Sequence, residues 1–327
     1  MIELLEHTKL ADDDCKIWRL TSPLHPGEGA RFLDFCLATM HSFPSRRNLS
    51  YWRHYYQHAF DGENSPEIED VFYFAEINGE VAARLWFGYA PANGFGNFGN
   101  ALTAEKFRRR GILRRMMVHC VRDFHASKAK CLSCDTGKEY AAATYMDYGF
   151  KLIYGGTVGP MAIVKPEYPD FAALEERFLG DARPVRFRPG VVGDQFLIDK
   201  FLHYCKKVYR DSPRADLDYR CCMLECRAGN GCIEVAENAA GALVGFAWAG
   251  RFDGVRRLFM KLHPDAAPHC GKMLTRLVRA GDGAPVCHLQ LPKGAGWTPA
   301  LEAAGARKLC TLADGSAVWE LSAPAGA

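Results

Sequence analysis

An internal repeat is the feature of this 327-residue chain that most constrains its fold. Residues 74–86 and 235–248 both read as a strand, a glycine-containing turn and a second strand that ends in tryptophan. Two glycines further along the chain recur in the same order. The matching pairs are Trp86 and Trp248, Gly111 and Gly271, and Gly149 and Gly305, with offsets of 162, 160 and 156. Nearly equal offsets indicate one structural unit that is used twice, so the sequence predicts a duplicated domain.

A short connector separates the two copies. Prolines at 166, 169 and 184 bracket a helical pattern in VKPEYPDFAALEERFLGDARPVR, as is typical of a linker. We expect one domain at 1–168 and a second at 183–327. Each half reads in the order strand, helices, antiparallel hairpin, strand, loop and helix, strand, helix, strand. This order predicts a mixed, mostly antiparallel α/β sheet flanked by helices, present twice in tandem.

Composition indicates an ordinary soluble globular protein. Hydrophobic residues make up 48% and charged residues 24% of the chain, and 41 basic residues face 38 acidic ones. A nucleic-acid-binding protein usually carries a stronger basic excess, so we expect no nucleic-acid partner. The N-terminus MIELLEHTKLADDDC lacks a basic segment followed by an apolar one, and no run of about 18 apolar residues occurs. We therefore expect a cytoplasmic protein with no membrane partner.

The thirteen cysteines do not predict a metal site or a disulfide framework. The count is odd, and a chain of this length can build a core without disulfides. Cys131 and Cys134 form a CxxC pair within a strand-like segment, where residues three apart point to opposite faces and cannot share an ion. The cluster at 221–232 has no matching CxxC or histidine pair. We expect reduced thiols and no metal.

The segment EKFRRRGILRRMM, residues 105–117, is the strongest candidate for a binding site. Apolar residues after Gly111 follow helical spacing, so the arginines lie in the loop that leads into a helix N-terminus. Such an N-terminus offers unpaired amides and a partial positive charge to an anion, and arginine side chains match phosphate oxygens. A diphosphate is the ligand that we expect at Arg108, Arg109 and Arg110. Two other readings are a solvated turn, which is the common role of a charge run, and a nucleic-acid contact, which would call for interleaved aromatic residues.

At this point the chain resembles the GNAT superfamily of acyl-coenzyme A-dependent N-acyltransferases. ALTAEKFRRRGILRRMM is similar to the family's strand, Arg/Gln-x-x-Gly-x-Gly/Ala loop and helix, with Arg108 and Gly111 on the first two motif positions and Leu113 where a small residue is usual. AAATYMDYGF is similar to the family's Tyr-x-x-x-Gly-Phe helix end. The resemblance covers about residues 15–165. The second half has PDAAPHCG in place of the arginine loop and Leu301 in place of Tyr145, which implies a degenerate C-terminal copy and a catalytic N-terminal one.

The resemblance implies transfer of an acyl group, by direct attack on a thioester, from acetyl-CoA or another acyl-CoA that serves as co-substrate. The backbone of Arg109, Arg110, Gly111 and Ile112 would then hold the diphosphate, and the strand at Leu102 and Thr103 would pair with the pantetheine arm. Tyr145 lies where the family often places the general acid that protonates the leaving thiolate. Without the resemblance, the spacing of Tyr145 would indicate a tyrosine packed in the core.

The general base is less clearly marked. The strand before the arginine loop carries Asn97 and Asn100 but no acidic residue, so the carboxylate that is common on that strand is missing. Asp135, at the end of the next strand, is our candidate base; the other reading is a cap for the helix that carries Tyr145.

Residues 50–60, SYWRHYYQHAF, read as an aromatic helix that begins after a Ser50 cap and would cover the acceptor site, or as an ordinary packed helix. His54 and His58 have the spacing of two metal ligands on a helix, but no HExxH motif is present.

The resemblance therefore implies an EC 2.3.1 acyltransferase that moves an acetyl or other short acyl group to the amine of a small molecule. The alternatives are transfer to a carrier-protein thiol, even with decarboxylation of the donor, and a non-catalytic acyl-CoA sensor or scaffold. The degenerate copy would shape the site or mimic a dimer partner within a monomer. The residues do not specify the acceptor or the oligomeric state.

Overall fold

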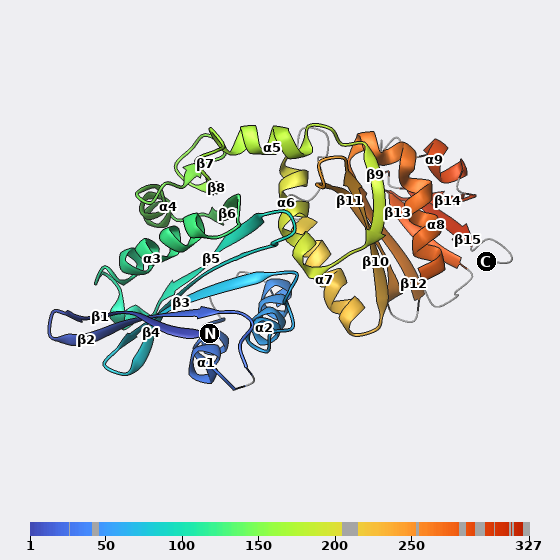
Figure 1. Ribbon diagram of the computed structural model, residues 1–327. Helices are drawn as coiled ribbons and strands as arrows, with labels where there is room; N and C mark the ends of the chain where they lie inside the picture. The colour runs from blue at the N-terminus through green and yellow to red at the C-terminus, as the bar shows by residue number, and fades with distance from the viewer. Residues whose placement is uncertain are drawn as a thin grey trace. The chain divides into compact units, whose positions relative to one another are not determined.

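The computed structural model is a mixed α/β protein that contains two compact units, Met1–Leu174 and Glu175–Ala327 (Figure 1). The residues that it describes are 1–25, 27–40, 46–204, 215–252, 255–280, 286–291, 298–303, 305–313, 315 and 317–322. Each unit is built around one sheet, and each is described below by itself.

Unit 1 contains eight strands and five helices among the described residues, counting a helix that crosses into unit 2. The strands are β1 (Ile2–Leu10), β2 (Asp13–Thr21), β3 (Glu69–Ile77), β4 (Glu80–Tyr89), β5 (Phe95–Thr103), β6 (Cys131–Thr136), β7 (Lys151–Leu152) and β8 (Gly159–Val164). The α-helices are α1 (Ala30–Ala38), α2 (Arg46–Phe60), α3 (Ile112–Ala126), α4 (Glu139–Met146) and α5 (Phe171–Leu179), and a 3₁₀ turn, η2 (Glu105–Phe107), precedes α3.

The strands of unit 1 form one sheet in the order β1-β2-β3-β4-β5-β6-β8-β7. Every neighbouring pair is antiparallel except β5 and β6, which are parallel and are connected by α3. The predicted hairpin at 74–86 is the β3–β4 pair, and the predicted strand KCLSCDT is β6. Both predictions are confirmed.

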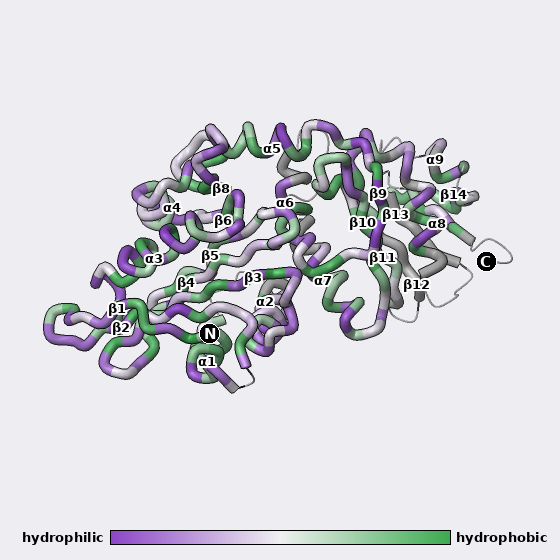
Figure 2. The backbone as a smooth tube through the Cα atoms, viewed as in Figure 1, coloured by the Kyte–Doolittle hydropathy of each residue, from purple (hydrophilic) through white to green (hydrophobic). Residues whose placement is uncertain are grey.

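Helices cover both faces of this sheet (Figure 1). On one face α3 and α4 join a core cluster, to which α3 contributes Ile112, Met116, Met117, Cys120 and Phe124. These apolar residues alternate with polar ones along the helix (Figure 2), which is the amphipathic pattern predicted from the sequence. On the other face α1 and α2 pack through aromatic rings; the Phe32 and Phe74 ring centroids, for example, are 4.6 Å apart.

Unit 2 repeats this plan. Its strands are β9 (Pro184–Pro189), β10 (Gly231–Asn238), β11 (Leu243–Phe252), β12 (Val255–Leu262), β13 (Val286–Leu291), β14 (Arg307–Thr311) and β15 (Ala317–Ser322). Its helices are α6 (Gln195–Tyr204), α7 (Ala215–Arg227), α8 (Cys270–Ala280) and α9 (Thr298–Ala303), with 3₁₀ turns η3 (Val192–Asp194) and η5 (Pro264–His269).

The two sheets match strand for strand from β2 and β9 onward. The order in unit 2 is β9-β10-β11-β12-β13-β15-β14, and β12 and β13 form its parallel pair. Two helices follow the first matched strand in each unit, and one helix follows the fourth. The predicted tandem duplication is therefore confirmed by topology. Two details differ from the predicted order: unit 1 begins with an additional strand, β1, and each unit ends in a two-stranded hairpin instead of a single strand.

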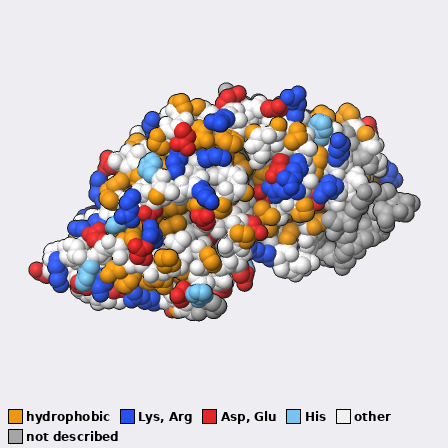
Figure 3. Space-filling view, in the orientation of Figure 1, with side chains coloured by type: hydrophobic (Ala, Val, Ile, Leu, Met, Phe, Trp, Pro, Cys, Tyr) orange, Lys and Arg blue, Asp and Glu red, His pale blue; other side chains and the backbone are white. Residues whose placement is uncertain are grey.

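Charges on the visible surface are mixed. Lysine and arginine side chains alternate with aspartate and glutamate across the face drawn in Figure 3, without a continuous basic band on that face. Within the described residues, no helix has the length and apolar character needed to cross a bilayer.

Candidate active site

The arginine turn folds into two left-handed residues placed just before α3. Arg108 is extended, Arg109 has φ = 62°, and Gly111, the N-cap of α3, has φ = 75° and ψ = 6°. A side-chain hydrogen bond does not cap this helix. Glycine enters the left-handed region without the steric cost that a Cβ imposes, which explains its use as the N-cap. The predicted helix start at Gly111 is confirmed.

The backbone amides of this turn have no hydrogen-bond acceptor among the described residues. In the described part of the chain, the backbone N–H groups of Arg109, Arg110, Gly111 and Ile112 donate no hydrogen bond, whereas Arg108 N–H donates to the Glu105 carbonyl and Arg115 N–H to the Gly111 carbonyl. The first N–H groups of a helix always lack an intrahelical partner, and a turn with alternating left-handed residues directs adjacent amides to one side. The turn is therefore a concentration of positive backbone dipoles.

The arginine side chains of the turn differ in their partners. Arg108 Nε donates to the Thr103 carbonyl at 3.2 Å, and Arg110 forms an ion pair with Asp13. This pair lowers the pKa of the Asp13 carboxyl, chiefly through the hydrogen bond from Arg110. Arg109 is exposed and makes no hydrogen bond or ion pair with any described residue. Its guanidinium is available to a ligand.

Leu113, which stands where the motif usually has a small residue, does not obstruct the turn. Its half-buried side chain packs against the core cluster, beside the fully buried Ile112. A Cβ added to Gly111 would meet no atom within 4 Å, so the space next to the turn is open.

Strand β5 separates from β6 next to this turn. Among the described residues, Phe95, Gly96 and Asn97 are the part of β5 that pairs with β6, and the part from residue 98 onward, with Leu102 and Thr103, pairs with β4 alone. A β-bulge interrupts the β4 pairing before Leu102, and Asn100 has φ = 52° there. A bulge of this kind bends its strand, and the strand edge that faces away from β4 is left for a ligand to pair with.

Tyr145 lies at the point where the two strands separate. Its ring packs edge-on against Phe98, the first residue of β5 beyond the paired segment, with centroids 4.9 Å apart. The side chain is buried, and burial raises the pKa of the hydroxyl above its ordinary value, with a smaller contribution from Cys134 on β6. The hydroxyl makes no hydrogen bond to any described residue. It is therefore a protonated donor with free hydrogen-bonding capacity.

Asp135 lies at the end of β6 and is exposed. Leu132 belongs to the core cluster with Tyr145 and Cys134 packs against that cluster, so Asp135, one residue further along the strand, points to the opposite face. The alternative reading of Asp135 as a helix cap is wrong, because α4 begins after Lys138 with no side-chain cap. Asp135 forms no ion pair or hydrogen bond with the described residues.

Helix α2 packs over the Asp135 face of the sheet. It begins at Arg46, so the predicted Ser50 cap is wrong; Ser50 lies inside the first turns of the helix. Tyr51, Tyr55 and Tyr56 are buried, which confirms the packed amphipathic reading. The rings of His54 and His58 stack with centroids 6.2 Å apart, and His58 also contacts Glu63. The described residues contain no cluster of three potential metal ligands.

Two buried polar residues near the site escaped the sequence prediction. Asp70 on β3 is fully buried and accepts hydrogen bonds from Tyr55 Oη at 2.6 Å and Trp86 Nε1 at 2.7 Å. Arg84 on β4 is 2% exposed. Strict alternation along β4 would have placed Arg84 on the same inner face as Trp86, which is the signal that could have identified it.

Unit 2 lacks several of these features. Turn η5 replaces the arginine loop, Gly271 lies inside α8 without a positive φ, and β11 and β12 pair in continuous register with no bulge. Leu301, which matches Tyr145, is fully buried.

Comparison with known proteins gives fold-level similarities. No protein-family model and no curated protein matches the chain. Among solved structures, a tandem GNAT protein from the clavulanic acid biosynthesis pathway is 13% identical over 94% of this chain and all of its own, with a TM-score of 0.37. A GNAT superfamily phosphinothricin acetyltransferase from Sinorhizobium meliloti, in complex with AcCoA, is 16% identical over 43% of this chain and 89% of its own, with a TM-score of 0.36. RimL, a ribosomal L7/L12 alpha-N-protein acetyltransferase in complex with coenzyme A, is 14% identical over 49% of this chain and 98% of its own, with a TM-score of 0.33. The solved chains to which this protein is similar include a tandem GNAT protein and a GNAT superfamily acetyltransferase.

Proposed function

We propose that the protein is an acyl-CoA-dependent acyltransferase that moves an acetyl or other short acyl group to the amine of a small molecule. The observation that carries the proposal is the set of unpaired amides from Arg109 to Ile112 at the start of α3, next to the separated end of β5. A diphosphate can accept several such hydrogen bonds at once, and the free Arg109 guanidinium adds charge. The open β5 edge at Leu102 and Thr103 suits an extended, amide-containing arm such as pantetheine.

Tyr145 and Asp135 lie on opposite faces of the sheet beside this point, which suits the two proton transfers of the reaction. The amine nitrogen attacks the thioester carbon and the carbon–sulfur bond breaks, so the sulfur gains a negative charge and the nitrogen loses a proton. Tyr145 would give its phenolic proton to the sulfur, and Asp135 would accept the proton of the amine. General acid or base help of this kind typically contributes about 10²–10⁴ in rate.

Release of free thiol from acetyl-CoA, measured against a panel of small amines, tests the proposal. We expect thiol release that depends on the amine, with the acetylated amine as product. Binding of acetyl-CoA in calorimetry, with no release of free thiol in the presence of any amine, would favour a non-catalytic acyl-CoA sensor instead. Thiol release that needs a carrier protein would favour acylation of the carrier-protein thiol.

The role of Asp135 has its own test. We expect Asp135→Asn to lower turnover at least tenfold near neutral pH, and the loss to shrink as pH rises, because the acceptor amine then loses its proton to solvent without help. Asp147→Asn, which changes an exposed carboxylate that pairs with Arg114, is the control. An equal loss at every pH would assign Asp135 to a structural role.

A further inference from the structure

Arg84 is a buried cation that has no carboxylate partner within the described part of the chain. Its Nε donates to the Asn100 carbonyl at 3.2 Å and its Nη1 donates to the Thr39 hydroxyl. The guanidinium carbon lies 5.8 Å from the centroid of the Tyr56 ring. These partners are all uncharged, and no acidic side chain of the described residues forms an ion pair with Arg84.

Two titratable groups that interact with the Arg84 charge, the Cys36 thiol and the Tyr56 hydroxyl, do not supply a negative charge. Burial raises the pKa of the Cys36 thiol to about 12 and also raises the pKa of the Tyr56 hydroxyl, although the Arg84 charge opposes both changes. Both groups are therefore neutral near pH 7. Thr39 is the C-cap of α1, and a helix C-terminus contributes at most about half a negative charge.

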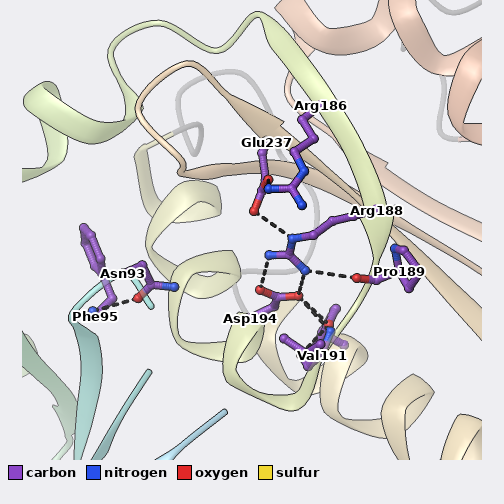
Figure 4. A network of polar contacts seen from close by, with 9 residues as sticks. Asn93, Phe95, Arg186, Arg188, Pro189, Val191, Asp194 and Glu237 are labelled. Atoms are coloured by element: carbon purple, nitrogen blue, oxygen red, sulfur yellow. Dashed lines mark hydrogen bonds and ion pairs between the residues drawn. The ribbon is translucent and has the colours of Figure 1, made fainter. Parts of the chain in front are cut away.

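A second arginine of the same protein shows the usual arrangement. Arg188 on β9 is more exposed, at 21% of its side chain, and still pairs with two carboxylates (Figure 4). Its two Nη atoms donate to the two oxygens of Asp194, each at 2.8 Å, and its Nε donates to Glu237 at 2.8 Å. Buried charges are normally compensated in this way, because an uncompensated one is costly.

The fold itself does not need a cation at this place. In unit 2 the matching residue is Phe246, which, like Arg84, precedes the strand's tryptophan by two positions. Phe246 is fully buried and its ring packs edge-on against Tyr219 of α7, with centroids 5.2 Å apart. In unit 1 the ring of Tyr56 of α2 lies next to Arg84. An aromatic side chain therefore fills the equivalent place in the duplicate.

Asn100, whose backbone carbonyl accepts from Arg84 Nε, also has a side-chain donor that is not satisfied. Its Nδ2 is buried without a hydrogen-bond partner, at the bulge where β5 leaves β6. A buried amide that lacks a partner is destabilising unless a ligand satisfies it. The neighbouring Gly99 has open space on its side-chain side, since an added Cβ would meet nothing within 4 Å. A ligand can therefore approach the bulge.

We propose that Arg84 and Asn100 form a carboxylate-binding subsite, and that the acyl acceptor is an amino carboxylic acid whose carboxylate binds there. A carboxylate supplies the missing charge and accepts from both donors, and guanidinium groups bind carboxylates with directional hydrogen bonds. The assignment of the carboxylate to the acceptor depends on the proposed acyl transfer, but the subsite itself does not.

Thermal unfolding tests the subsite without any acyl transfer. A panel of amino acids and their amides is added to the full-length protein, and the unfolding temperature is measured for the wild type, Arg84→Met and Asn100→Gly. Asn100→Gly removes the amide but keeps the left-handed backbone. We expect at least one amino acid to raise the wild-type unfolding temperature, its amide to have no effect, and both variants to lose the response. Arg122→Met, an exposed arginine of α3, should respond as the wild type does.

Measurement of thiol release shows whether the carboxylate that binds Arg84 belongs to the acceptor or to the acyl group. With acetyl-CoA, we expect Arg84→Met to raise KM for the amino acid at least tenfold and to leave KM for its amide unchanged, with Arg84→Lys in between. With malonyl-CoA or succinyl-CoA and an uncharged amine, Arg84→Met should change nothing; a loss confined to these donors would overturn the acceptor assignment and place the carboxylate on the acyl group.

The two proposals fail in different ways. Thiol release that is the same for carboxylate and amide acceptors, in the wild type and in Arg84→Met, overturns the assignment of the carboxylate to the acceptor and leaves the acyltransferase intact. No thiol release, combined with carboxylate-dependent stabilisation that requires Arg84, overturns the acyltransferase and supports the subsite.

Discussion

The Tyr145 side chain combines the two properties that a general acid for a thiolate needs. Burial raises its pKa, so the hydroxyl keeps its proton across the neutral range, and its contact with Phe98 places it where β5 and β6 separate. A tyrosine in water loses its proton near pH 10. Since the shift in Tyr145 is upward, deprotonation of this residue should not reduce activity until the pH is well above that value.

We expect Tyr145→Phe to lower turnover at least tenfold with less than a twofold change in the dissociation constant of coenzyme A, because the ring packing is kept and only the proton donor is lost. Steady-state kinetics at saturating substrates and calorimetry provide the two numbers. Tyr140→Phe, an exposed tyrosine of α4, is the matched control. Unchanged turnover in Tyr145→Phe would exclude the acid role.

A substitution at Gly111 tests whether the turn before α3 binds the diphosphate. An alanine at φ = 75° costs roughly 1–2 kcal/mol in backbone strain, although the space around its Cβ is open. The turn should relax, and the backbone N–H groups of residues 109–112 should lose their alignment. We expect Gly111→Ala to weaken coenzyme A binding about tenfold and to leave the weak binding of pantetheine, which lacks the diphosphate, unchanged.

Unit 2 contains the control for this substitution. Gly271 matches Gly111 in the repeat but has helical geometry within α8, where alanine is favoured over glycine by roughly 0.5–1 kcal/mol. Gly271→Ala should bind coenzyme A as the wild type does. Equal effects of the two substitutions in calorimetry would mean that the turn at Gly111 is not the diphosphate site.

At the scale of elements, helix α2 is held on the sheet partly by one buried acid. Asp70 on β3 accepts a hydrogen bond from Tyr55 of α2, and burial raises the pKa of its carboxyl to about 6, although hydrogen bonds from Tyr55 and Trp86 oppose the rise. The pKa in the unfolded chain is about 3.9. Between these two values the folded protein holds a proton that the unfolded chain releases, so the free energy of unfolding falls as pH rises from about 4 to about 6.

We expect Asp70→Asn to remove this part of the pH dependence. A pKa shift of this size corresponds to roughly 2–3 kcal/mol in the free energy of unfolding. This contribution is fully present below the unfolded pKa and is lost above the folded pKa. The amide oxygen of asparagine can still accept from Tyr55 and Trp86. The measurement is the difference in unfolding temperature between the wild type and Asp70→Asn from pH 4 to pH 8. The wild-type value should fall relative to that of the variant as pH rises to about 6. A constant difference across that range would contradict the assignment.

The elements also show what the sequence could and could not predict. Local patterns sufficed for α3 and the β3–β4 hairpin, because amphipathic spacing and a glycine turn act over a few residues. The start of α2 was missed because Ser50 is a good cap in isolation, while the helix in fact begins four residues earlier. The Arg84 and Asn100 pair was missed for another reason. It depends on the β5 bulge and on the fact that no described carboxylate pairs with Arg84, and both are properties of the assembled sheet.

At the scale of the whole molecule, the two units share a topology but differ in every feature proposed to bind coenzyme A through its phosphates. Unit 1 has the left-handed Gly111, the backbone N–H groups of residues 109–112 and the bulged strand β5. Unit 2 has the turn η5, a helical Gly271 and a regular β11–β12 pair. Duplication therefore preserved the sheet, which the buried core requires, while the turn diverged. This contrast supports the proposal that domain 1–168 is catalytic and that domain 183–327 is degenerate.

We expect the full-length protein to bind one coenzyme A per chain. The unpaired amides of the Gly111 turn offer several charge-assisted hydrogen bonds to a diphosphate, whereas η5 includes two prolines, which have no N–H to donate. Calorimetric titration of the wild type should show a single site, and Gly111→Ala should weaken that site without revealing a second one. Gly271→Ala should leave both stoichiometry and affinity unchanged. Two sites of similar affinity, or a single site that is sensitive to Gly271→Ala and not to Gly111→Ala, would mean that the second unit binds coenzyme A through a geometry other than an amide turn before a helix.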